Sequence, residues 1–213
     1  MEIKFKKYWR KTSLKNKEDG NFLLRHIEKI KPKNFLEVGV FHGVTSRNVC
    51  EILYSLHGSN FKFTGIDLFS NDEKVLSDEY APRTTFSNPL KTIYYNFIIR
   101  SDPYNIKSVN KLLRKFEKNI NIIKGNSNDV LKEINLDGID YVFLDGGHKY
   151  ETVRNDLENL TQIVNNNGTI LCDDYDLSYA PGVRKAIDEH VLSKNYNLKI
   201  LNSRFAEITK KHP

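Results

Sequence analysis

From residue 34 onward, short apolar runs alternate with amphipathic segments, and this alternation constrains the fold more than any other feature of the sequence. Short apolar runs bounded by turn residues predict buried strands, and amphipathic segments predict helices. Strands that alternate with helices favour a mostly parallel sheet covered on both faces. We therefore expect an α/β fold with a seven-stranded, mostly parallel sheet and helices on both faces.

The expected strands comprise residues 35–40, 61–67, 120–124, 139–145, 169–172, 198–201 and 205–209. The expected helices comprise residues 45–56, 106–116, 129–134, 150–164 and 183–192, and Asn165 to Gly168 reads as a turn. Residues 70–104 hold three prolines and predict an insertion or lid, with a plain solvent-exposed excursion as the alternative. At 213 residues, the chain is expected to form one domain, with residues 1–30 as an N-terminal helical extension.

The composition fits a globular protein, with 39% hydrophobic and 28% charged residues. No apolar run approaches the roughly 20 residues of a membrane helix, so no membrane span is expected. The first ten residues lack the apolar core and cleavage site of a secretory signal, which predicts a cytoplasmic location. Cys50 and Cys172 have no CxxC spacing and are expected to be buried free thiols.

The chain is basic, with a formal net charge of +6 and a pI near 9.1. Basic residues are locally dense only near the N-terminus, at Lys4, Lys6, Lys7, Arg10, Lys11, Lys15 and Lys17. We interpret this cluster as a solvated face in preference to a phosphate-binding patch, and we do not expect nucleic acid as a partner. The nearby Phe5, Tyr8 and Trp9 are candidates for packing against a second subunit of a homo-oligomer.

Two motifs at strand ends indicate an adenosine ligand. In the segment 37–43, Gly39 permits a tight turn and Gly43 allows close approach of the backbone, before a helix N-terminus. Asp67 ends the next strand, where a carboxylate accepts hydrogen bonds from ribose hydroxyls. An ordinary glycine turn and a turn-capping aspartate are the alternatives. Glu37 stands where dinucleotide sites carry a glycine; it would repel a pyrophosphate and suit the ammonium of S-adenosylmethionine.

Further motifs carry a family resemblance. Segments 37–43, 125–129 and 144–150, together with Asp67, look like the successive motifs of class I, Rossmann-like S-adenosylmethionine-dependent methyltransferases. The combination of residues 145–148, 173–175 and 181–183 resembles that of the macrocin and cephalosporin-pathway O-methyltransferases, and more distantly that of catechol O-methyltransferase. The resemblance covers residues 34 to about 192.

The resemblance implies roles for matching positions. The methionine end of the cofactor would be lined by Glu37, Gly39, Phe41 and Thr45, with Gly43 and Asp145 also at the cofactor. Asp67 would hold the ribose and Leu68 would lie against the adenine. Ser127 and Asn128 would meet the adenine edge.

Three carboxylates, those of Asp145, Asp173 and Asp174, follow two strands that are expected to be neighbours. Their mutual repulsion predicts a divalent metal such as Mg²⁺, which prefers oxygen ligands and lowers the pKa of a bound hydroxyl; caps of a loop or turn are the alternative. His148 lies three residues after Asp145 and is the candidate base, since histidine accepts a proton near neutral pH. A hydrogen-bonded histidine at a helix start is the alternative.

These residues predict metal-assisted O-methylation of a sugar or another small hydroxylated molecule, with His148 and Asp145 as catalytic residues. A methyltransferase acting on nitrogen or on RNA is one alternative, although no Asn/Asp-Pro-Pro-Tyr motif is present. A non-catalytic adenosine-binding domain is the other.

Overall fold

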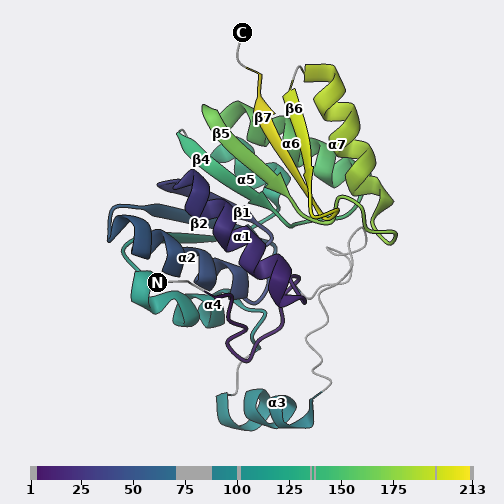
Figure 1. The fold of residues 1–213 in the computed structure, drawn as a ribbon. Helices are drawn as coiled ribbons and strands as arrows, with labels where there is room; N and C mark the ends of the chain where they lie inside the picture. Colours follow the sequence, from purple (N-terminus) through teal and green to yellow (C-terminus); the bar gives the residue numbers. More distant parts are fainter. Residues whose placement is uncertain are drawn as a thin grey trace.

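The computed structural model describes residues 4–70, 88–99, 102–134, 136, 138–194 and 196–211. One seven-stranded sheet with the order β3-β2-β1-β4-β5-β7-β6 runs through them (Figure 1). Its strands are β1 (Asn34–Val38), β2 (Lys62–Asp67), β3 (Ile120–Lys124), β4 (Ile139–Leu144), β5 (Val164–Cys172), β6 (Tyr196–Leu201) and β7 (Phe205–Lys210). Strands β1 to β5 pair in parallel, whereas β7 pairs antiparallel with β5 and β6. The predicted fold class is confirmed.

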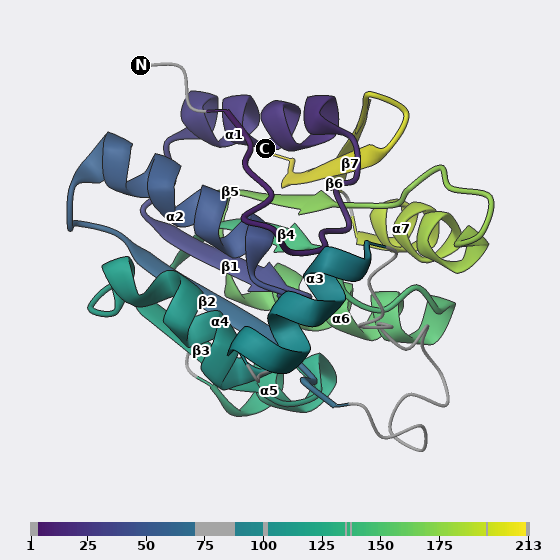
Figure 2. The ribbon, with the colours of Figure 1, turned by 90° about the horizontal axis from the view of Figure 1, so that it is seen from below.

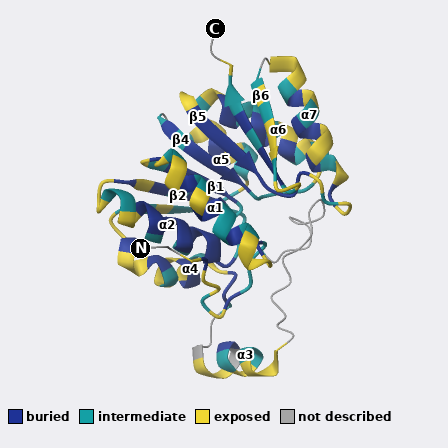
Figure 3. Ribbon diagram, in the orientation of Figure 1, coloured by how far each residue is buried: buried dark blue, intermediate teal, exposed yellow. Residues whose placement is uncertain are grey.

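Helices cover both faces of this sheet (Figure 2). On one face, aromatic residues such as Phe35, Phe63 and Tyr141 pack under α1 (Lys17–Ile30), α2 (Val44–His57) and α4 (Ile106–Leu113). On the other face, aliphatic residues pack under α5 (Ser127–Glu133), α6 (Tyr150–Ile163) and α7 (Pro181–Lys194). Successive side chains of a strand point to opposite faces, so each strand supplies both cores. The central strands are therefore buried along most of their length (Figure 3).

Strand β5 differs from the prediction, which placed a turn at Asn165 to Gly168. The strand already begins at Val164, directly after α6, and contains these four residues. Its pairing with β4 shifts register between Ile139 and Tyr141, so the polar residues lie in an irregular first half of the strand. An irregular pairing of this kind tolerates asparagine and glycine that a regular strand disfavours, and sequence alone does not separate it from a turn.

The N-terminal residues cross the helices of the first face. Residues 4–16 form no helix, and α1 begins after Asn16, whose side chain accepts a hydrogen bond from the Glu18 amide. Phe5 is buried against Gly20 within its own chain, so it is not available to a second subunit. Trp9 remains 59% exposed and contacts the ring of Tyr94.

The predicted insertion of residues 70–104 lies partly outside the described residues. Its described part contains α3 (Pro89–Ile93) and a π-helical turn (Tyr94–Ile99), which lie away from the sheet at the bottom of Figure 1. Cys50 and Cys172 are free and buried, as predicted. Among the described residues, no helix combines the length and apolar character required to cross a bilayer.

Candidate active site

A cavity of about 1030 Å³ opens at the carboxyl ends of the parallel strands. This edge is where open α/β sheets bind their ligands. Nine of the residues predicted for cofactor, metal or catalysis line the cavity, namely Gly39, Phe41, Asp67, Leu68, Ser127, Asn128, Asp145, His148 and Asp174. Residues from β1 and β2 and from the segments that follow β3, β4 and β5 therefore meet in one space.

Gly39 brings the ends of β1 and β4 into close contact. Its φ is +95°, and a Cβ added there would lie 1.9 Å from the carbonyl oxygen of Asp145. Only glycine adopts this conformation without strain and leaves room for the second strand. The predicted tight turn is present, and it also fixes the backbone that carries Asp145.

Asp67 organises the turn after β1. Its carboxylate accepts hydrogen bonds from the Phe41 amide at 2.7 Å, the Phe69 amide at 2.9 Å and the Tyr104 hydroxyl at 2.8 Å. Burial raises the pKa of Asp67, and the three donors oppose that shift. Tyr104 is a cavity residue that the sequence analysis missed, because it lies in the segment read as an insertion.

Glu37, Gly43 and Thr45 do not line the cavity, although the resemblance placed them at the cofactor. Glu37 is fully buried beneath α2, where it accepts a hydrogen bond from the Ser46 hydroxyl. The alternation of side chains along β1 turns Glu37 away from the side that its neighbour Val38 presents to the cavity. Gly43 caps α2 with a φ of +72°, and Thr45 is buried in its first turn.

Glu37 predicts a pH dependence of stability. Burial raises the pKa of its carboxyl group to about 8. The folded chain therefore keeps a proton that the unfolded chain loses near pH 4.5. Between these values, the free energy of unfolding falls by about 1.4 kcal/mol per pH unit from this group. Glu37→Gln should remove that part of the slope in urea unfolding of the cofactor-free protein; an unchanged slope would contradict it.

The structure brings the three predicted carboxylates together. Asp145, Asp173 and Asp174 each offer an oxygen, and the three oxygens lie within 4.8 Å of one another. Burial, followed by the charges of the other two aspartates, raises the pKa of Asp145. Burial also raises the pKa of Asp173 to about 6, although Arg204 opposes that shift.

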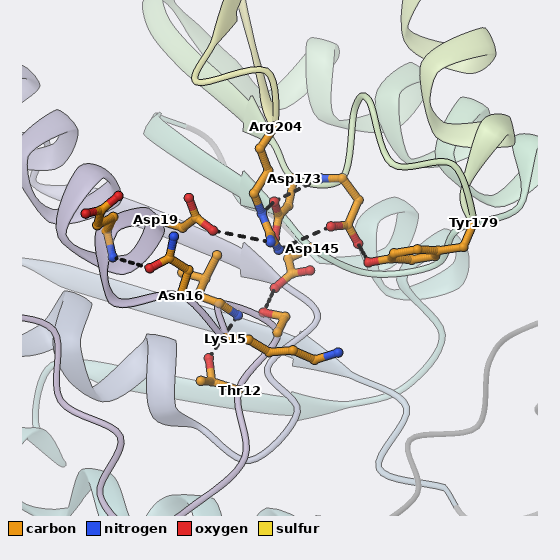
Figure 4. A network of polar contacts seen from close by, with 12 residues as sticks. Thr12, Lys15, Asn16, Asp19, Asp145, Asp173, Tyr179 and Arg204 are labelled. Atoms are coloured by element: carbon orange, nitrogen blue, oxygen red, sulfur yellow. Dashed lines mark hydrogen bonds and ion pairs between the residues drawn. The ribbon is translucent and has the colours of Figure 1, made fainter.

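Arg204 lies among these carboxylates and was not predicted from the sequence (Figure 4). Its guanidinium donates from Nε to Asp173 Oδ1 at 2.5 Å and from Nη2 to Asp173 Oδ2 at 2.7 Å. The Nη2 atom also lies 3.2 Å from Asp174 Oδ1, and Nη1 lies 3.5 Å from Asp19. Arg204 precedes β7, whose antiparallel pairing with β5 brings the turn before it to the carboxyl end of β5. A prediction that β6 and β7 form a hairpin beside β5 would have placed Arg204 near the acidic cluster.

His148 contacts the same cluster. Its Nε2 lies 2.8 Å from Asp174 Oδ2, and the Tyr179 hydroxyl donates to the same oxygen at 3.4 Å. Asp174 thus directs one oxygen to His148 and the other to Arg204. A carboxylate held against an imidazole fixes the orientation and tautomer of the ring.

The basic N-terminal segment covers one side of the cavity instead of forming only a solvated face. Arg10 is buried and donates to the carbonyl oxygens of His42 and Ser108, both at 2.9 Å. The Ser13 hydroxyl donates to Asp145 Oδ2 at 2.5 Å. The cavity lining accordingly includes Lys7, Arg10, Lys11, Thr12, Ser13 and Lys15. Local charge density does not reveal this position, because it depends on contacts with distant residues.

Solved structures share this fold. The O-methyltransferase NovP is 18% identical, with 92% of this chain and 79% of NovP covered and a TM-score of 0.65. The S-adenosylhomocysteine-bound methyltransferase PaMTH1 of Podospora anserina is 15% identical, with 92% and 80% covered and a TM-score of 0.63. CalS11, a TDP-rhamnose 3'-O-methyltransferase of calicheamicin biosynthesis, is 13% identical, with 90% and 78% covered and a TM-score of 0.59. No curated protein sequence matches the chain.

The strand order, the glycine turn after β1 and the cavity beyond the strand ends are those of the class I methyltransferase fold. The profile of one sequence family, described as a methyltransferase domain, matches residues 36–175. The chain belongs to this methyltransferase family.

Proposed function

We propose that this methyltransferase transfers the methyl group of S-adenosylmethionine to a hydroxyl oxygen of a saccharide or another small molecule. One observation carries the proposal: the cavity that is lined by most of the predicted cofactor residues is also lined by His148 and by Asp145 and Asp174 of the acidic cluster. At about 1030 Å³ it has room for a cofactor with a small acceptor beside it. The O-methyltransferase neighbours NovP and CalS11 support an oxygen acceptor.

The residues fit an adenosine-containing cofactor. Asn128 lines the cavity, and its Oδ1 is buried without a hydrogen-bond partner among the described residues. A buried acceptor without a donor is costly, and the exocyclic amino group of adenine is a donor of the required kind. Asp67 would hold the ribose at the end of β2, with Leu68 and Ser127 beside the adenine.

The residues also fit a divalent cation, such as Mg²⁺, at the acidic cluster. Asp174 Oδ1 is buried and has no hydrogen-bond partner among the described residues; it has only the ion pair with Arg204. Asp145 and Asp174 would hold the cation, because both oxygens of Asp173 are engaged by Arg204. A bound divalent cation would lower the pKa of the acceptor hydroxyl.

The side chains of the protein would perform the proton transfer and exclude water. A neutral His148 that donates from Nε2 to Asp174 keeps a lone pair on Nδ1, which accepts the proton of the acceptor hydroxyl. Thr12 and Ser13 would cover the reacting atoms from the N-terminal side. Methyl transfer then requires only that the acceptor oxygen lie in line with the methyl group.

The basic rim of the cavity favours an acceptor that carries a negative charge. Lys7, Lys11, Lys15 and Lys91 line the cavity, and burial together with the charges of Lys15 and Lys91 lowers the pKa of Lys11. An anionic group near these lysines would relieve their repulsion. A sugar linked to a nucleoside diphosphate has this chemistry, and so does the TDP-rhamnose named for CalS11.

The test is transfer of a labelled methyl group to a panel of neutral and anionic hydroxylated acceptors, including nucleoside diphosphate sugars. We expect an O-methylated product, loss of most activity after exhaustive EDTA treatment, and recovery with Mg²⁺. Full activity in EDTA would contradict the metal role alone. Transfer to nitrogen, or tight and salt-sensitive RNA binding, would replace the proposal with the nitrogen- or RNA-directed alternative. Binding of cofactor without any transfer would favour a non-catalytic domain.

A further inference from the structure

Arg204 is fixed in the acidic cluster by its backbone as well as by its side chain. Its carbonyl oxygen accepts a hydrogen bond from the Tyr175 amide at 2.9 Å, and its amide donates to the Leu201 carbonyl at 3.2 Å. Both bonds tie the turn before β7 to the loop and strand beside it. The guanidinium therefore reaches the aspartates from a fixed position (Figure 4). The Arg204 side chain is only 16% exposed.

Asp173 is turned fully toward this guanidinium. Arg204 engages both of its carboxylate oxygens, and Oδ1 also accepts the Asp174 amide at 2.9 Å. Two parallel bonds between an arginine fork and a carboxylate are strong and geometrically specific. The oxygens that would coordinate a cation from Asp173 are thus already hydrogen-bonded.

The charges of the cluster lead to the same conclusion. When they are ionised, as cation ligands would be, the three aspartates carry three negative charges, and Arg204 offsets one of them. The remaining two negative charges match one divalent cation. The positive charge of Arg204 also repels any cation bound beside it, in a buried place where screening is weak.

We propose that Arg204 is a built-in counter-cation that withholds Asp173 from the divalent cation and weakens its binding, leaving Asp145 and Asp174 as its protein ligands. This inference rests on the cation site of the proposed function. It explains why the third carboxylate is present without being a ligand. Asp173 positions Arg204, and Arg204 sets the affinity of the site.

The test measures Mn²⁺ binding to the full chain by the electron paramagnetic resonance signal of free Mn²⁺, so it requires neither acceptor nor activity. Arg204→Gln removes the positive charge and releases Asp173, and we expect the Kd for Mn²⁺ to fall about tenfold or more. The double variant Arg204→Gln with Asp173→Asn restores the original net charge and the same two ligands. Its Kd should return to within a few-fold of the wild-type value.

Arg184→Gln is the matched control, because Arg184 is 57% exposed, pairs with Asp176 on the surface and carries the same charge. The Arg184→Gln variant should bind Mn²⁺ with the wild-type Kd. If thermal unfolding shows that Arg204→Gln does not fold, Arg204→Lys replaces it; an ammonium cannot hold both oxygens of Asp173, so a smaller fall in Kd is expected. The inference would be overturned if Arg204→Gln left the Kd for Mn²⁺ unchanged or raised it. It would also be overturned if the double variant bound Mn²⁺ as tightly as Arg204→Gln alone. Methyl transfer is assayed separately, so failure of the Mn²⁺-binding test and failure of the proposed methyl transfer can be told apart.

Discussion

Gly39→Val is expected to abolish measurable binding of S-adenosylmethionine and to destabilise the fold by about 3 kcal/mol or more. The Cβ of the new side chain would overlap the Asp145 carbonyl oxygen, which lies 1.9 Å from that position, and it would lie 2.9 Å from the Gly146 Cα. These are backbone atoms of a neighbouring strand end, so the ends of β1 and β4 would have to separate. The cofactor loop and the acidic cluster would move apart with them.

Urea unfolding and calorimetry with S-adenosylmethionine measure these two effects. Gly58→Val is the matched control, since Gly58 also has a positive φ of +60° but a Cβ there meets nothing within 4 Å. The control should lose only the about 1–3 kcal/mol of backbone strain and should bind the cofactor as the wild type does. Wild-type cofactor affinity in a folded Gly39→Val protein would refute the role assigned to this turn.

His148→Ala should lower kcat for methyl transfer by a factor of about 10² to 10⁴, the usual contribution of a positioned base. The Kd for S-adenosylmethionine should stay near the wild-type value, because His148 contacts Asp174, whereas Asp67 at the predicted ribose position is held by the Phe41 amide and the Tyr104 hydroxyl. Added imidazole should restore part of the activity, which a purely structural defect would not allow.

His57→Ala serves as the control for His148→Ala, since His57 lies in the last turn of α2, away from the cavity. It should leave kcat unchanged. A His148→Ala enzyme that keeps the wild-type rate across the pH range would show that another group takes the proton from the acceptor.

The sequence predicts the parts of this structure that local pattern determines. The strand at 139–145 is a continuous apolar run that ends on an acid, and β4 occupies Ile139–Leu144. The three aspartates were expected to meet because neighbouring parallel strands end at one edge, and their oxygens do converge. The prediction of a turn at Asn165 to Gly168 was wrong, because an irregular parallel pairing and a turn use the same polar residues.

The contacts that complete the site depend on distant parts of the chain. Ser13 meets Asp145, and Asp19 meets Arg204, only after the N-terminal segment has crossed the sheet and the β6–β7 hairpin has formed. The burial of Glu37 beneath α2 was not predicted, for a different reason. The motif gives its position on β1, but the side that the side chain faces depends on how α2 packs over the strand.

The pairing of Arg204 with residues on both sides of the acidic cluster has a consequence for the order in which the protein is made. During synthesis, β4 and β5 emerge before the turn that precedes β7, so the three aspartates exist for a time without their guanidinium. Without Arg204 beside them, ionised aspartates at the ends of β4 and β5 would repel one another as these strand ends come together. The last hairpin is therefore the step that closes the site, and the N-terminal helix is fastened to it through Asp19.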